Sequence, residues 1–254
     1  MSAVPLSLSL SALLQRADVW RGDALGRAEQ AGVASGFASL DALLPGGGWP
    51  RGALTELLLP RAGLGGGLGE LALLRPALKA LDADAGWVLL VSPPWRPLAP
   101  AWQGFGPGLS RLLVVEAARD DAAWACEQLL ASGSVAALLA WLPDSDAKAL
   151  RRLQLAMAGQ QTLAFVFRPN QVVGSASPAP LRISLEADEA GLKLHIVKRR
   201  GPPLAAPLTL QIERPVSWAR LAARQVLASR QPDVVMREGA PEGRVVNAAD
   251  AARA

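Results

Sequence analysis

Cysteine and long apolar runs are scarce in this chain of 254 residues. The single cysteine, Cys126, excludes an internal disulfide and a cysteine cluster for a metal ion. The longest apolar run, Val135 to Leu142, is far shorter than the roughly 20 residues of a membrane-spanning helix. The amino-terminal stretch lacks the basic start and the clear cleavage site of a secretory signal. We therefore expect a cytoplasmic protein with no membrane partner, in which Cys126 is a small apolar residue on a helix.

The charged residues and the single histidine of this sequence indicate little about its function. The formal charge of +4 and the pI of about 10.0 come mostly from arginine spread along the chain. A concentrated basic stripe occurs only at Lys193 to Arg200, where Lys193 and Arg199 are candidates for contact with DNA, although such a stripe is more often a solvated strand face. The one histidine, His195, alternates with apolar neighbours and is expected on the polar face of a strand. No nucleophile or carboxylate constellation accompanies it, so we assign it no catalytic role.

The stretch from Gly36 to Leu81 organises the chain. It predicts a strand at 54–59, a glycine-dense loop and a helix that begins near Leu68 or Gly69, which is the order of a phosphate-binding loop. Such a loop also needs a lysine for the phosphate charge and a hydroxyl for Mg²⁺, and both are missing between Pro60 and Leu74. We therefore predict a vestigial loop without a cofactor; anion binding by the backbone amides at the helix start is the alternative. Its glycines are Gly63, Gly65, Gly66, Gly67 and Gly69.

Apolar strands and amphipathic helices alternate after this loop. We expect helices at 68–81, 120–133 and 144–159 and strands at 87–91, 111–116, 135–142 and 163–167. The spacing in the first helix predicts one buried face made of Leu71, Leu74, Leu78 and Leu81. Asp120 or Asp121 is the expected N-cap of the second helix, and the segment 144–146 is expected to cap the third. This alternation predicts an α/β fold with a doubly wound, mostly parallel sheet. Shorter strands at 181–185, 192–198 and 208–212 are expected as antiparallel additions at one sheet edge.

We divide the chain into three parts: an N-terminal arm (1–34), a core with a degenerate phosphate loop (35–214), and a C-terminal helix with a mobile tail (215–254). The arm carries Trp20, and the terminal helix carries Trp218 with Arg220 and Arg224. These four residues are candidates for partner binding, because tryptophan and arginine are enriched at binding hot spots.

The order of these signals resembles the RecA-like ATPase core over about residues 33 to 213. The string GFASLDALLPGGGWPRGALTEL is similar to the RecA segment that leads into its phosphate loop, and HIVKRRGPPLAAPLTLQI is similar to the strand pair that closes the RecA core. Three further strings resemble the ImuA family, a RecA-like accessory of bacterial mutagenic translesion synthesis that is related to SulA. They are VWRGD (Val19 to Asp23), LPGGGWPRGALTELL (Leu44 to Leu58) and GELALLRPAL (Gly69 to Leu78).

The resemblance implies a protein that is not an enzyme. In RecA an acidic residue after the second strand activates water, whereas this chain has Ser92, Pro93 and Pro94 at that place. The aspartate that ends the Walker B strand has no counterpart in the apolar stretch 138–142. Lys198 and Arg200 match two RecA cations that reach the ATP of a neighbouring subunit, and we expect them to bind RecA.

The expected function is therefore that of an adaptor in SOS-induced mutagenic translesion synthesis. By the same resemblance its partners are RecA and an ImuB-type Y-family-like protein, and through the latter an error-prone polymerase and the sliding clamp. Single-stranded DNA is a further candidate partner, although the short link between Arg168 and Ser177 argues against RecA-style DNA binding. The alternatives are a SulA-like cell-division inhibitor, which would bind FtsZ, and a divergent DNA-dependent ATPase.

Overall fold

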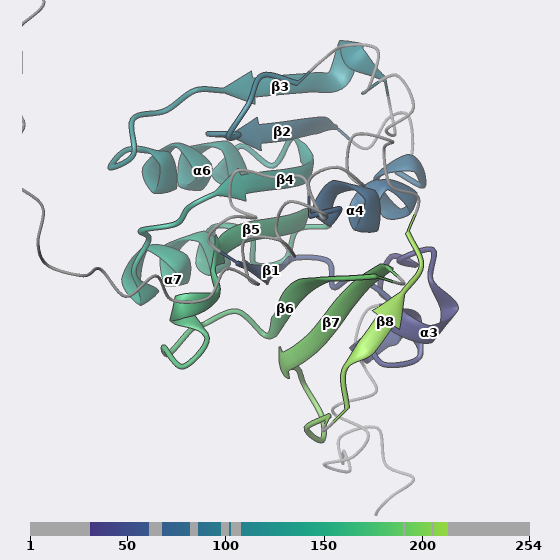
Figure 1. The fold of residues 1–254 in the computed structure, drawn as a ribbon. Helices are drawn as coiled ribbons and strands as arrows, with labels where there is room; N and C mark the ends of the chain where they lie inside the picture. The colour runs from purple at the N-terminus through teal and green to yellow at the C-terminus, as the bar shows by residue number, and fades with distance from the viewer. Residues whose placement is uncertain are drawn as a thin grey trace, which may run out of the picture.

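The computed structural model describes residues 31–60, 68–81, 86–97, 102, 108–189, 191–204 and 206–212. Its centre is one eight-stranded sheet in the order β3-β2-β4-β5-β1-β6-β7-β8 (Figure 1). Most of the predicted arm and the predicted terminal helix and tail lie outside the described residues, so Trp20, Trp218, Arg220 and Arg224 are not placed.

The sheet is parallel except at one edge. The parallel strands are, in spatial order, β3 (Leu112–Val115), β2 (Trp87–Val91), β4 (Val135–Trp141), β5 (Leu163–Pro169), β1 (Ala53–Leu59) and β6 (Leu181–Asp188). β7 (Gly191–Lys198) pairs antiparallel with β6, and β8 (Leu208–Leu210) pairs antiparallel with β7. The predicted α/β class, with a mostly parallel sheet and antiparallel pairing at one edge, is confirmed.

Helices cover both faces of the parallel part of the sheet. α4 (Glu70–Lys79) packs on one face, over a core that includes Leu57 and Phe165. α6 (Ala122–Ala131) and α7 (Ala147–Ala156) pack on the other face, over a core that includes Leu54 and Leu138. Because both faces are covered, β4 is buried at every position, as its continuous apolar run predicts. Short helical turns complete the fold: α3 (Ala38–Asp41), η1 (Pro45–Gly47), η3 (Leu109–Arg111) and η4 (Asn170–Val172).

The segment before β1 is held by a buried tryptophan. Val33 and Trp49 exchange two backbone hydrogen bonds, of 2.9 and 2.7 Å. The Trp49 indole is fully buried and meets Phe165 edge to face, with 5.3 Å between ring centroids. Val33, which the sequence assigns to the arm, therefore pairs with the core.

Two local predictions agree with the structure only in part. Asp121 is the N-cap of α6, as expected, but its backbone is helical (φ −93°, ψ −13°) rather than extended, and its side chain makes no cap hydrogen bond. On α4, Leu71 of the predicted buried stripe is only half-buried, whereas Leu73 and Ala77 are fully buried. A helix that covers a sheet buries a broader stripe than the narrow seam that we predicted.

Two other local predictions, on Asp146 and Cys126, are confirmed. Asp146 caps α7 by accepting a 2.7 Å hydrogen bond from the Ala149 amide. Cys126 is a buried residue of α6, and burial raises the pKa of its thiol to about 12. In the described part of the chain, we find no helix whose length and apolar character would let it cross a membrane.

Candidate functional site

The first candidate site is the junction between β1 and α4, where the sequence predicts a vestigial phosphate loop. β1 ends at Leu59 and α4 begins at Glu70. Gly63, Gly65, Gly66 and Gly67 lie outside the described residues. Gly69 is described and has φ of 98°, and a Cβ there would come within 2.3 Å of the Ile212 side chain. The left-handed backbone favours glycine at that position, whereas the Ile212 contact is with the end of a flexible side chain that can move.

A carboxylate occupies the start of α4. Glu70 is the first residue of α4 and directly follows Gly69, at the place where we expect the lysine of a phosphate loop to be missing. Glu70 is 1% exposed, and its Oε2 accepts a 3.1 Å hydrogen bond from the Leu68 amide. The carboxylate therefore meets the positive end of the helix from inside the protein. Our reading of the sequence missed Glu70, although it directly follows the last glycine of the predicted loop.

This arrangement disfavours phosphate at the helix start. A bound phosphate would lie close to the buried Glu70 carboxylate, and like charges repel strongly where water is excluded. The amide of Leu68 already has an acceptor. The alternative that backbone amides here hold an anion is therefore electrostatically unfavourable.

The second candidate site is a hollow at the carboxyl ends of β2 and β4. It has a volume of about 250 Å³, and its lining includes Ser92, Arg119, Trp141 and Asp144. Ser92 has φ of 49°, which is rare for a residue with a side chain, and its hydroxyl donates to the Ala117 carbonyl at 3.3 Å. Asp144, the single carboxylate among the lining residues, pairs with Arg119 at 3.0 Å.

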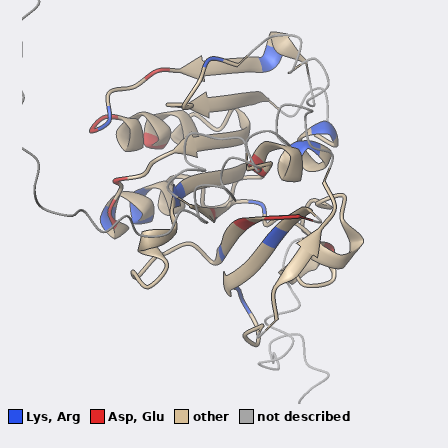
Figure 2. Cartoon of the chain, in the orientation of Figure 1, with Lys and Arg blue, Asp and Glu red and all other residues tan. Residues whose placement is uncertain are grey.

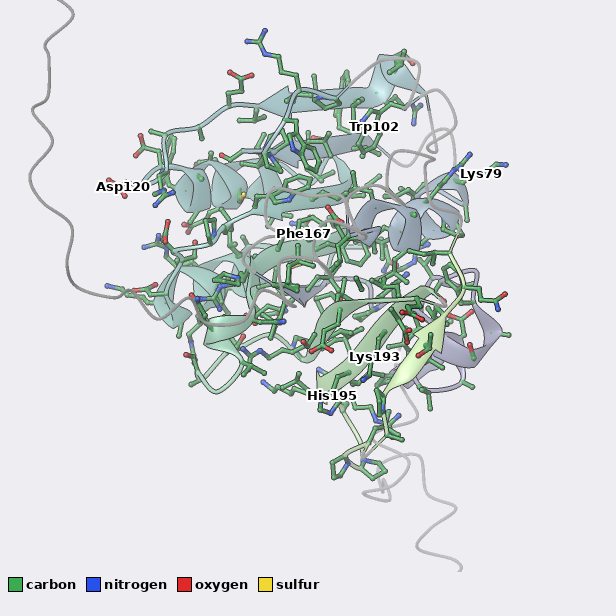
Figure 3. All side chains as sticks on the ribbon, viewed as in Figure 1. Lys79, Trp102, Asp120, Phe167, Lys193 and His195 are labelled. Atoms are coloured by element: carbon green, nitrogen blue, oxygen red, sulfur yellow. The ribbon has the colours of Figure 1, made fainter. Side chains whose placement is uncertain are left out.

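Aromatic packing fills the end of β4. The Trp141 indole is 5% exposed and stacks on Phe167, with 4.5 Å between ring centroids. Phe167 lies near the middle of the view in Figure 3. An indole thus occupies the end of β4, where the RecA resemblance would require a carboxylate for Mg²⁺. The residues in this hollow suit neither metal binding nor activation of water.

The third candidate site is a buried ionic cluster between β1, β5 and β6. The Glu56 side chain is fully buried, and its carboxylate accepts from Arg182 Nε at 2.7 Å and from Arg168 Nη1 at 3.5 Å. The Ser177 hydroxyl also donates to Glu56. Two guanidinium groups thus share one carboxylate in a region closed to water.

This cluster clamps the link between β5 and β6. Arg182 donates to the carbonyls of Val172, Val173 and Ser175 at 2.8 to 3.0 Å. Ser184 donates to the Asn170 side chain at 3.0 Å. The β5–β6 link is therefore held against the core by buried hydrogen bonds.

Arg168 is the residue of this cluster whose buried charge is least offset by its partners. Burial lowers the pKa of its guanidinium; Glu56 opposes this effect, and the nearby charge of Arg182 adds to it. Its Nη2 donates to the Ser145 carbonyl, but its buried Nε has no hydrogen-bond partner. The cost of burying this cation is thus only partly offset.

The structure separates the residues of the basic stripe. Lys193 and His195 lie on β7, opposite Glu186 and Ser184 of β6, on the strand face away from the core (Figure 3). Lys198 is exposed, and its Nζ donates to the Ser177 carbonyl at 2.8 Å.

The remaining two arginines follow β7. Arg199 turns back to the core, where it donates to the carbonyls of Leu43 and Pro202, and Arg200 is an exposed residue of the following turn. In the view of Figure 2, described cations and carboxylates are interspersed, which differs from the single-sign surface typical of nucleic-acid binders.

The chain is similar in sequence to a SulA protein and matches a solved SulA structure. No protein-family model matches the chain. The cell division inhibitor SulA of Photorhabdus laumondii is 32% identical over 128 residues, which cover 49% of this chain and 68% of that protein. The crystal structure of SulA from Pseudomonas aeruginosa is 21% identical, with a TM-score of 0.38, and the match covers 46% of this chain and 98% of that one.

Proposed function

The chain belongs to the SulA family of cell division inhibitors, and from this premise we propose that it inhibits division by binding a protein of the division machinery. The observation that carries the proposal is the 32% identity over 68% of the length of SulA. We propose FtsZ as the target and the response to DNA damage as the setting. This reading takes the place of the translesion adaptor as the leading function.

The experiment uses the purified full chain and purified FtsZ. We expect the chain to lower FtsZ assembly, measured by light scattering and by sedimentation, in proportion to its concentration. Its expression in growing bacteria should produce filamentous cells that continue to replicate their DNA. Unchanged FtsZ assembly at excess chain, together with normal cell length, would refute the proposal.

We further propose that the protein acts without catalysis on a RecA-like core that has lost its nucleotide site. The support is local: Glu70 replaces the phosphate-binding lysine, Ser92 follows β2, and Trp141 fills the end of β4. Calorimetric titration with ATP and Mg²⁺ should show no binding. Turnover of ATP by the purified chain, with or without DNA, would establish the ATPase alternative instead.

A second candidate function is the ImuA-type adaptor of translesion synthesis. The SulA match accounts for 49% of this chain, and the long strings that resemble ImuA, such as Leu44 to Leu58, include buried parts of the core. In this role the chain would bind RecA and an ImuB-type protein, with Lys198 and Arg200 at the RecA contact. Lys198 is exposed but bonds the β5–β6 link, so its use by a partner would release that link.

One pull-down separates the two functions. From bacteria with damaged DNA, the division-inhibitor function predicts FtsZ among the captured proteins, and the adaptor function predicts RecA and the ImuB-type protein. The adaptor function also predicts that Lys198→Ala with Arg200→Ala weakens RecA capture. The control is Lys148→Ala with Arg151→Ala, which removes two exposed cations from α7 and should leave capture unchanged.

A further inference from the structure

The two helices on one face of the sheet expose large apolar side chains to solvent. Trp124 on α6 is 58% exposed and Leu155 on α7 is 64% exposed, the two highest values among the large apolar residues that the structure describes. α6 and α7 pack side by side over the same core (Figure 1). Neither residue belongs to the buried stripe of its helix. The outer side of this helix layer therefore carries two apolar groups that remain largely open to solvent.

An ion pair shows which parts of the two helices adjoin. Both helices follow strands of the parallel part of the sheet, so they run in the same direction. Arg152 of α7 meets Glu127 of α6 at 3.0 Å. Trp124 lies one turn before Glu127, and Lys148 lies one turn before Arg152, because residues three or four positions apart share one helix face. The Trp124 indole and the Lys148 side chain therefore lie at the same level of the helix layer.

The outer face of α7 is basic. Lys148, Arg151 and Leu155 are all exposed, and their spacing of three and four residues places them along one face of the helix. α7 contains no acidic residue, and the ion pairs of the described chain include neither Lys148 nor Arg151. We call Trp124, Lys148, Arg151 and Leu155 the α6–α7 surface. It combines two cations that a partner can reach with an apolar group at each end.

The composition of the α6–α7 surface favours a protein partner over nucleic acid. Exposed tryptophan and arginine often carry the binding energy of protein interfaces, and cations beside an apolar contact steer an acidic partner toward it. A phosphate backbone would meet two carboxylates at the margin of the same surface, namely Glu127 and the α7 cap residue Asp146. A protein segment with a few spaced carboxylates can avoid both. The surface therefore fits an acidic segment that has apolar side chains between its carboxylates.

We propose that this chain binds FtsZ through the α6–α7 surface, which receives an acidic segment of FtsZ with apolar side chains between its carboxylates. The inference rests on the division-inhibitor function proposed above and assigns that function to particular residues. Carboxylates of the partner pair with Lys148 and Arg151, and Trp124 and Leu155 become buried against its apolar side chains. The apolar burial supplies affinity, and the charges supply specificity and speed of association.

The first test reverses the charges of the surface. The affinity of the purified full chain for purified FtsZ is measured by calorimetry at low and at high salt. At low salt, Lys148→Glu with Arg151→Glu should weaken binding about tenfold or more, and the effect should be smaller at high salt because exposed charges are screened. The matched control, Lys79→Glu with Arg96→Glu, changes the net charge by the same amount at two exposed cations elsewhere and should keep the wild-type affinity.

The second test removes the apolar groups and leaves the charges in place. Trp124→Ala and Leu155→Ala should each weaken FtsZ binding about fivefold or more, because each removes an apolar group from the contact. Trp95→Ala is the control: Trp95 is 48% exposed after β2, outside the surface, and its replacement should leave binding unchanged. The substituted side chains are exposed, so the urea midpoints of all variants should match the wild type, which separates lost binding from lost folding.

The outcomes separate this inference from the function on which it rests. If the wild type binds FtsZ and the surface variants bind it equally tightly, the surface assignment is overturned and the division-inhibitor function stands. If the wild type does not bind FtsZ, both are overturned. If single-stranded DNA binds the wild type, and the double charge reversal abolishes that binding without changing the affinity for FtsZ, the surface belongs to nucleic acid and the proposal is again overturned.

Discussion

Replacement of Glu56 by glutamine tests the buried ionic cluster most directly. Glutamine has almost the same shape as glutamate, so the substitution removes the negative charge without opening a cavity. The charge that it removes faces Arg182 at 2.7 Å and Arg168 at 3.5 Å, and all three side chains are at most 6% exposed. Two guanidinium groups then lose the carboxylate that they share, and only Arg168 keeps a weaker favourable interaction, with Asp146.

The expected loss of stability is large. Removal of one partner from a buried ion pair costs about 3–5 kcal/mol, and two cations depend on this one carboxylate. Domains are stable by roughly 5–15 kcal/mol, so Glu56→Gln should remove a large share of the total. Arg168→Met should cost less than Glu56→Gln, because burial already lowers the Arg168 pKa and Glu56 keeps Arg182 and Ser177 as partners.

Urea unfolding followed by circular dichroism measures these differences. The matched control is Glu127→Gln on α6, whose partner Arg152 lies 3.0 Å away in an ion pair that is partly exposed. That substitution should cost about 0–1 kcal/mol. Hydrogen exchange supplies a second measure: in Glu56→Gln the amides of the β5–β6 link should exchange faster, because the clamp on this link is weakened.

Two results would refute this reasoning. One is a loss of stability in Glu56→Gln no larger than that of the Glu127→Gln control. The other is a larger loss in Arg168→Met than in Glu56→Gln, because Arg168 would then be well compensated despite its unbonded Nε.

Three further predictions concern single positions. Glu70→Lys puts a positive charge at the positive end of α4 and should lower the unfolding free energy by about 2 kcal/mol without ATP turnover, as urea unfolding and a phosphate-release assay would show. Gly36→Ala places a Cβ 2.3 Å from Pro76 and should lower the melting temperature more than Gly47→Ala, where φ is also positive but space is open; equal shifts would contradict the predicted clash. The Cys126 thiol should react with a thiol reagent only after unfolding. Because its folded pKa is raised, its contribution to stability is complete below pH 9 and falls by about 1.4 kcal/mol per unit from pH 9 toward 12; Cys126→Ala should lack this part of the pH dependence.

Sequence periodicity predicted most of the fold because its strands are continuous apolar runs between glycine and proline. The prediction for β2 agrees with the structure at both ends, where Gly86 precedes it and Ser92 and Pro93 follow it. Asp121 was predicted correctly as the N-cap of α6, but its cap bond does not form, because its backbone is helical rather than extended. Cap residues indicate where a helix begins, but the backbone conformation of the cap residue decides whether the bond forms.

The ionic cluster was not predicted, since its members are far apart in sequence. Arg168 and Arg182 are 112 and 126 residues from Glu56. One local signal was nevertheless present: Glu56 interrupts an apolar run that becomes a buried strand. A buried carboxylate requires a paired cation, so a single acidic residue in such a run predicts arginine or lysine on a neighbouring strand. The order of the strands, which a single sequence does not reveal, decides which cation it is.

Three residues on which the proposed loss of a nucleotide site depends also have structural roles of their own. Glu70 accepts from the Leu68 amide, Ser92 donates to the Ala117 carbonyl, and Trp141 packs on Phe167. If the core once held a nucleotide, as we propose, a lysine at position 70 would still leave Trp141 at the end of β4, and an acid at position 92 would still leave Glu70 at the start of α4. On that proposal no single substitution restores the whole site, and replacement of Glu70 or Trp141 removes a contact that stabilises the fold.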